Sequence, residues 1–190
     1  MNAGAAPPGE MVPVWDFAVR VLHWSLVLSV AAAWLTRHSP GRWHEWLGYA
    51  TLAIVAARTA WGFIGAGHAR FGEFMRSPAA TAAYARSVVG GREARYLGHN
   101  PLGGWMVAAL LAMVALVGFT GWLYTTDRFW GIAWVERLHS TLSDVLFVFV
   151  ALHIVGVVFT SARHRENLLA SMLHGRKRIG DAGHRPEGGR

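Results

Sequence analysis

Residues 138–161 read LHSTLSDVLFVFVALHIVGVVFTS, and this stretch decides the fold. A helix that crosses the hydrocarbon core of a membrane needs about 20 mostly apolar residues, and this run is long enough. It also contains two histidines, His139 and His153. Ionisable side chains are costly inside a membrane span, so we interpret both histidines as functional rather than incidental.

The spacing of these two histidines predicts two sites rather than one. They are 14 residues apart, which is just under four helical turns, so both rings project from nearly the same face. The helical rise separates them by about 21 Å along the axis. A single metal ion cannot be shared over that distance, whereas two sites at two depths of the membrane can each take one ring.

Three further apolar runs complete a set of four predicted spans. The spans cover about 15–36, 44–64, 102–126 and 138–161. Of the 190 residues, 53% are hydrophobic and only 15% are charged, against about a quarter charged in soluble domains. We therefore predict an all-α integral membrane four-helix bundle and no nucleic-acid-binding face.

The spans divide the chain into three parts. We expect a flexible N-terminus over 1–13, the transmembrane domain over 14–162 and a basic tail over 163–190. Basic residues are concentrated in the tail and in the long loop that joins the second span to the third, and they are sparse in the other two loops. The positive-inside rule then places both termini in the cytoplasm.

These directions give each histidine a depth. The first span enters from the inside and carries His23 a few residues in, which matches the depth of His153 on the outgoing fourth span. The second span enters from the outside with His44 at its start, which matches His139. The predicted pairs are therefore His23 with His153 at an inner level and His44 with His139 at an outer level.

Two imidazoles that face each other across a helical bundle are the usual axial ligands of a b-type haem. The sequence has no Cys, which excludes thiolate ligands and covalent c-type attachment. Two simpler interpretations remain open: histidines that only pack and hydrogen-bond, and a histidine-lined path for a metal ion. An ion path would favour carboxylates among the histidines, and only Asp144 lies deep in a span, where it could instead orient a ligand ring.

Two arginines also enter the spans near the inner level. Arg20 and Arg58 would neutralise the propionates of the inner haem, because guanidinium groups suit carboxylates. The alternative is that they extend to the inner interface or pair with Asp16.

Short motifs along nearly the whole chain resemble the bacterial cytochrome b561 and nickel–iron hydrogenase b-type cytochrome family. They are RVLHW around His23, HEWLGY from His44, RTAWGF from Arg58, HARF from His68, GHNPLGGWM around His99 and the histidine pair of the last span. The resemblance implies two haem b groups held by His23, His44, His139 and His153. It assigns no role to His68 or His99.

The resemblance also implies a function in electron transport. We expect a respiratory-chain cytochrome that passes electrons between the quinone pool, such as ubiquinone, and a partner protein: a c-type cytochrome, a hydrogenase or another dehydrogenase. One alternative is an enzyme that oxidises superoxide and reduces quinone, with anions attracted by Arg37, Arg42, Arg128 and Arg137 at the outer end. A more distant alternative is a metal transporter lined by the histidines. No catalytic residue is assigned, and the sequence leaves open whether the protein is itself an enzyme.

Overall fold

Four long helices make up most of the computed structural model, which describes residues 10–178. They are α1 (Phe17–Leu35), α2 (Trp43–Ile64), α5 (Pro101–Tyr124) and α6 (Ala133–His164). Each is long and apolar enough to cross a membrane. The prediction of an all-α four-helix membrane bundle is confirmed, apart from one small two-stranded sheet.

Local sequence signals set where two of these helices begin. Asp16 caps α1, because its Oδ1 accepts a hydrogen bond of 2.7 Å from the Val19 amide. Asn100 caps α5 in the same way through the Gly103 amide, and Pro101 occupies the first turn. The fourth helix starts at Ala133, five residues before the predicted span, because the helix continues beyond the apolar run into Trp134, Glu136 and Arg137.

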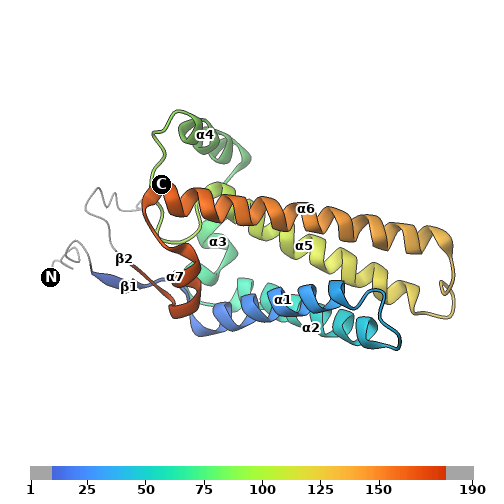
Figure 1. The fold of residues 1–190 in the computed structure, drawn as a ribbon. Coiled ribbons are helices and arrows are strands. Elements are labelled where there is room, and N and C mark those ends of the chain that lie inside the picture. The colour runs from blue at the N-terminus through green and yellow to red at the C-terminus, as the bar shows by residue number, and fades with distance from the viewer. Residues whose placement is uncertain (1–9, 179–190) are drawn as a thin grey trace.

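The helices form two antiparallel pairs that lie side by side (Figure 1). Helix α1 packs on α2, α5 packs on α6, and α2 joins the two pairs by packing on α5. Both short loops, 36–42 and 125–132, lie at one end of the bundle, which we call the hairpin end. The opposite end, which we call the terminal end, holds residues 10–16, 65–100 and 165–178.

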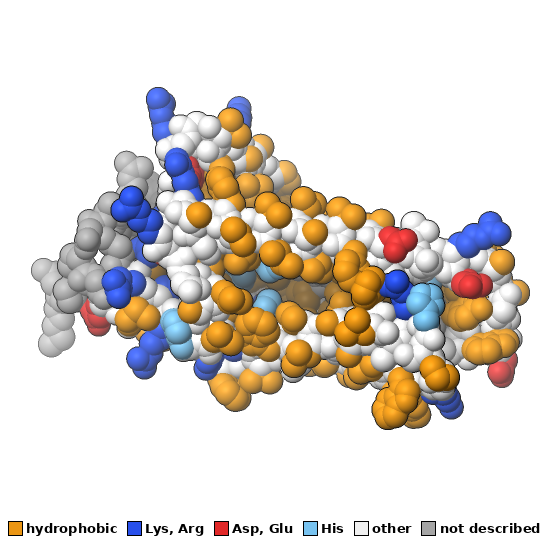
Figure 2. All heavy atoms as spheres, in the orientation of Figure 1, with side chains coloured by type: hydrophobic (Ala, Val, Ile, Leu, Met, Phe, Trp, Pro, Cys, Tyr) orange, Lys and Arg blue, Asp and Glu red, His pale blue; other side chains and the backbone are white. Residues whose placement is uncertain are grey.

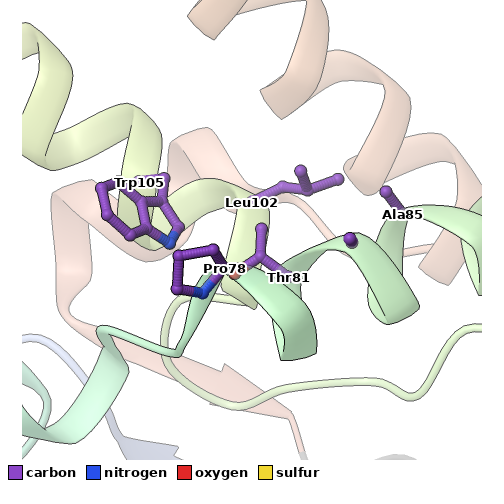
Figure 3. A pocket seen from close by; sticks show the side chains of 6 residues that line it. Pro78, Thr81, Ala85, Leu102 and Trp105 are labelled. Carbon is purple, nitrogen blue, oxygen red and sulfur yellow. The ribbon is translucent and has the colours of Figure 1, made fainter.

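The long connection at the terminal end contains structure that the sequence did not predict. It forms a 3-10 turn at Gly67–Ala69 and two helices, α3 (Phe71–Phe74) and α4 (Pro78–Val89). A shallow apolar groove lies between α4 and the start of α5 (Figure 3); it is lined by Pro78, Thr81, Ala82, Ala85, Leu102 and Trp105. This groove has no titratable side chain, so it is separate from the histidine sites.

The chain also closes on itself at the terminal end. Helix α7 (Leu168–His174) leads into β2 (Arg176–Arg178), which pairs antiparallel with β1 (Met11–Pro13). These elements fall within the segments expected to be a flexible N-terminus, 1–13, and a basic tail, 163–190. The remainder of both segments, 1–9 and 179–190, lies outside the described residues.

An apolar layer crosses the middle of the bundle. Val55, Val114 and Leu146 are buried there, and Leu26 and Val30 of α1 pack against them. Leu146 lies midway between His139 and His153 along α6, so the layer separates the two histidine levels. Figure 2 shows the face between the two helix pairs hollowed, with histidine side chains inside the hollow.

Candidate functional site

The hairpin end brings His44 and His139 together. Their ring centroids are 6.0 Å apart and their planes are almost perpendicular, at 79°. A metal bound at about 2 Å by one nitrogen of each ring would hold the ring centres about 6 Å apart. The observed separation therefore suits one metal atom between the two imidazoles.

Hydrogen bonds orient both rings for such a role. His44 Nδ1 lies 2.8 Å from the Ala33 carbonyl oxygen, and His139 Nδ1 lies 3.0 Å from the Val117 carbonyl oxygen. A carbonyl only accepts, so each Nδ1 donates and each Nε2 keeps a free lone pair. This is the ring orientation that metal-binding histidines adopt, with the second nitrogen held by an acceptor.

The orienting partner of His139 differs from the one that the sequence suggested. Asp144 is exposed on α6, and within residues 10–178 it makes no hydrogen bond to any of the four histidines. The Val117 carbonyl takes that role, and Thr120 Oγ1 lies 3.2 Å from the same His139 nitrogen. The suggestion that Asp144 orients a ligand ring is therefore wrong for this structure.

A glycine lets α5 approach the His139 ring closely. A Cβ atom at Gly121 would lie 3.0 Å from His139 Cε1, tighter than ordinary van der Waals contact. Gly118 serves a different purpose, because a Cβ there would collide with Leu52 of α2 at 2.6 Å. One glycine thus makes room for the candidate ligand, and the other lets two helices pack.

At the terminal-end level, His23 and His153 lie within electrostatic range of each other across the bundle. Both are half-buried, and the described residues include no direct contact between their rings. The His23 ring packs edge-on against Trp24, with centroids 5.3 Å apart. The structure therefore brings these two histidines to one level without the close ring approach seen for His44 and His139.

Arg58 lies beside this second pair and is enclosed. It is only 5% exposed, its charge reaches His23, and its Nη1 atom is shielded without a hydrogen-bond partner among the described residues. Its position follows from the helix period, because the buried residues Thr51, Val55, Arg58 and Gly62 form one face of α2. The Arg58 side chain therefore does not extend to solvent.

Arg20 has one partner and one orphan nitrogen. Its Nη1 donates to the Leu173 carbonyl oxygen at 2.7 Å, whereas its Nε is shielded and has no partner among the described residues. Asp16, the suggested partner of both arginines, accepts from the Val19 amide and from Trp61 Nε1 at 3.1 Å, and its charge also acts on Arg58. The two arginines therefore keep unused donors near the terminal-end histidines.

The structure also places His99 at this end, although no sequence pattern assigns it a role. Its ring lies between Trp15 and Phe74, with both centroid separations at 4.7 Å. Burial, followed by the charges of Arg58 and Lys177, lowers the pKa of His99 to about 3, so the ring is neutral. A histidine in a loop carries no periodic signal, which is why sequence patterning could not select it.

The remaining histidines lie elsewhere in the described chain. His68 Nδ1 would be 2.8 Å from a Cβ atom at Gly98, so this ring packs against the segment that leads to His99. His38 accepts from Arg37 Nε at 3.0 Å in the loop between α1 and α2. Residues 10–178 contain no group of three or more His, Asp or Glu that could hold a metal ion.

The basic residues of the hairpin end are differently engaged. Arg42 forms two hydrogen bonds with Glu45, at 2.8 and 2.5 Å. The guanidinium of Arg37 stacks 3.9 Å above the Trp34 ring, and that of Arg128 lies 5.7 Å from the Phe129 ring. Arg37, Arg128 and Arg137 are exposed, so a positive field remains near the His44–His139 pair.

Comparison with known proteins identifies a family but no individual relative. A family model described as prokaryotic cytochrome b561 matches residues 14–175, which includes all four long helices. Comparisons with curated proteins and with solved structures give no match.

Proposed function

Because the chain belongs to the prokaryotic cytochrome b561 family and is thus a multi-pass b-type electron-transfer cytochrome, we propose that it carries two haem b groups. His44 and His139 would hold one at the hairpin end, and His23 and His153 the other at the terminal end. The family supports haem b and electron transfer in general. The number of haems and their ligands are our proposal.

The observation that carries the proposal is the geometry of the hairpin-end pair. Two rings are 6.0 Å apart, and each has its Nδ1 held by a backbone carbonyl, which leaves both Nε2 lone pairs free to bind a metal. A bare zinc ion would need two more ligands, and the described residues supply no third. A porphyrin supplies four nitrogens of its own and needs only the two axial imidazoles. The same shortage of ligands counts against a histidine-lined metal transporter.

The second pair fits the same cofactor for a different reason. The side chains of α6 after Leu146 are exposed or half-exposed in the structure. The helix nevertheless packs on α5. Helices α1 and α6 approach each other through contacts such as that between Trp34 and Phe147, whose rings are 4.6 Å apart. The hollow between the two helix pairs in Figure 2, together with the orphan donors of Arg20 and Arg58, suits a flat anionic cofactor.

The haem iron, when bound, gains and releases one electron. The other elements come from the side chains of this protein. The four imidazoles would hold the two haems at their two levels, and the buried layer of Val55, Val114 and Leu146 would exclude water from the region between the levels. The guanidinium groups of Arg58, which is buried, and Arg20 would compensate the propionates at the terminal end. Electrons would thus cross between the two ends of the bundle through an apolar interior.

We also propose the orientation of the protein in the membrane and the partners with which it exchanges electrons. The basic residues of the terminal end would face the cytoplasm of a bacterial inner membrane, and the hairpin end would face outward. The protein would exchange electrons with quinone and with a redox partner such as a c-type cytochrome, a hydrogenase or another dehydrogenase.

A second function is favoured by the exposed arginines of the hairpin end. Each superoxide anion that delivers one electron there becomes O₂, and two such electrons with two protons reduce one quinone to quinol. The positive field around Arg37, Arg128 and Arg137 would attract the anion toward the His44–His139 pair. In this case the protein would be an enzyme rather than only a carrier.

The decisive experiment is a haem count on the purified full-length protein. A reduced-minus-oxidised spectrum and a pyridine haemochromogen assay should give about two haems b per chain. A colourless protein would exclude the proposal. One haem per chain would exclude the two-level arrangement while leaving the family intact.

A further inference from the structure

Three shielded nitrogen atoms toward the terminal end have no hydrogen-bond partner among the described residues. They are Arg20 Nε, Arg58 Nη1 and His99 Nδ1, and we call this set the donor pocket. Leaving a buried donor unsatisfied costs about 1–3 kcal/mol, and more when the group is charged. Native proteins therefore rarely keep such groups without a ligand, an ion or water to accept from them.

Electrostatic couplings place the donor pocket beside the terminal-end histidines. Arg58 acts on both His23 and His99, and His99 is coupled to His153. Arg20 lies three residues before His23 on α1, which is about one helical turn. Arg58 and His99 thus lie beside the two proposed ligands, and Arg20 lies about one turn from His23.

The His99 ring is held by its neighbours. Trp15 and Phe74 enclose it from two sides at 4.7 Å, and the next residue, Asn100, is fixed as the cap of α5. Because of this enclosure, the ring cannot turn its shielded nitrogen to solvent without breaking both aromatic contacts. The structure therefore presents the Nδ1 atom as a fixed donor or acceptor.

The C-terminal segment covers the donor pocket. The Gly175 carbonyl accepts from the amides of Val14 and Trp15, at 2.8 and 3.0 Å. Trp24 Nε1 donates to the Met172 carbonyl at 3.3 Å, and Trp15 Nε1 to Ser171 Oγ at 3.4 Å. This cover packs against Arg20, whose Nη1 is held by the Leu173 carbonyl oxygen.

The carboxylates near the donor pocket are already engaged. Both oxygens of Asp16 accept from other groups, the Val19 amide and Trp61 Nε1. Glu166 pairs with Arg95 and with the buried Lys177, whose Nζ is 3.7 Å from Oε2. Asp16 also acts electrostatically on Arg58, so the pocket combines directed donors with a carboxylate that is already hydrogen-bonded.

We propose that His99 is a third anchor for a haem propionate at the terminal end, acting together with Arg20 and Arg58. The inference rests on the proposed function and extends it to a residue that sequence patterning did not select. A carboxylate would accept from the two guanidinium groups and from the neutral imidazole at once. His99 would act as a positioning residue, because it would hold the edge of the cofactor and not the iron.

The test compares His99→Phe with His99→Asn in the full-length holoprotein. Phe keeps the packing between Trp15 and Phe74 but removes the nitrogen, whereas the Asn amide can restore a donor near the Nδ1 position. The readouts are the propionate bending mode in resonance Raman spectra and the rate of haem transfer to apomyoglobin. An H44A background, which retains only the terminal-end haem by our pairing, assigns the signal; the matched control is His38→Phe at the hairpin end.

Loss of one hydrogen bond to a charged group should speed haem release from the terminal end by about tenfold in His99→Phe. His99→Asn should stay within about twofold of the parent, and His38→Phe should not differ. An unchanged Raman mode and release rate in a folded His99→Phe protein would overturn this inference but leave the haem count standing. If His99→Phe does not fold, a rate in His99→Asn no different from that in His99→Ala would overturn it. A parent protein without haem would instead reject the proposed function itself.

Discussion

Arg58 follows His44 by 14 residues on α2, the same interval that separates the two histidines of α6. Both residues of α2 therefore lie on its interior face, one at each level of the bundle. Where α6 offers an imidazole at the terminal end, α2 offers a buried guanidinium. The two levels thus differ chemically.

The pairing of ligands can be tested by single substitutions. His153→Ala should lower the haem content from about two to about one per chain and spare the hairpin-end haem, and His44→Ala should do the reverse. Redox titration followed by pyridine haemochromogen assay distinguishes the two products. His174→Ala, an exposed histidine of α7, is the control and should retain both haems. Loss of both haems from each ligand variant, with the fold preserved, would refute the pairing.

Gly121 should be necessary for the hairpin-end site. Gly121→Ala places a methyl group 3.0 Å from His139 Cε1, so the ring must move or the helices must separate. Overpacking of this kind costs about 1–3 kcal/mol and should reduce occupancy of the hairpin-end haem. Gly72→Ala is the matched control, because a Cβ atom there meets nothing within 4 Å. Equal haem contents in the two variants would show that Gly121 does not position the ring.

Gly175 should be sensitive to substitution. It has φ +82°, and a Cβ atom would lie 2.7 Å from the Trp15 carbonyl oxygen, so Gly175→Ala adds a backbone clash to conformational strain. Gly41 has a similar φ of +86° but its nearest neighbour is 4.0 Å away. Thermal unfolding in detergent should therefore show a larger fall in Tm for Gly175→Ala than for Gly41→Ala. A fall of equal size would mean that the clash is relieved by movement of the C-terminal segment.

Acid should destabilise the terminal end through His99. Its pKa is about 3 in the folded protein, below the usual 6.5, because burial and nearby positive charges disfavour protonation. Between these two values the unfolded chain binds a proton that the folded chain does not. The free energy of unfolding therefore falls as the pH drops from 6.5 toward 3, by at most about 1.4 kcal/mol per pH unit.

Chemical denaturation across this pH range measures the slope. His99→Asn should show a shallower pH dependence than the parent, while His174→Asn, which changes an exposed ring, should leave the slope as it is. Parallel curves for the parent and His99→Asn would contradict the assignment of the acid sensitivity to this residue.

Anion attraction at the hairpin end distinguishes an enzyme from a simple carrier. If superoxide delivers electrons there, the double variant Arg37→Gln and Arg128→Gln should slow haem reduction by superoxide several-fold at low salt, and less at high salt. Stopped-flow spectroscopy measures this rate. Arg86→Gln removes one exposed charge at the opposite end and should have no effect. The same loss of rate in Arg86→Gln would point to net charge rather than to a local field.

The sequence predicts the parts of this molecule that repeat with the helix. Apolar runs of about 20 residues indicate the spans, and the 14-residue interval on α6 indicates two levels, because both signals depend only on helix geometry. The closeness of His44 and His139 follows from those levels. The site roles themselves remain predictions until haem is measured.

Other features depend on contacts between distant residues and have no local signal. The pairing of Met11–Pro13 with Arg176–Arg178 joins two three-residue segments near opposite ends of the described chain. The enclosure of His99 depends on Trp15 and Phe74, which come from two different elements. The suggestion that Asp144 orients a ligand ring was wrong because the depth of a residue in a span does not reveal which face of the helix it occupies.

The pairing of β1 with β2 has a consequence for biogenesis. A ribosome makes β1 first and β2 only after all four spans, so the terminal end cannot close while the chain is still being synthesised. Until then, the hydrogen bonds from the Val14 and Trp15 amides to the Gly175 carbonyl are also missing, so the C-terminal segment does not yet pack against the start of α1. The terminal end is therefore the last part of the described chain to be completed during translation.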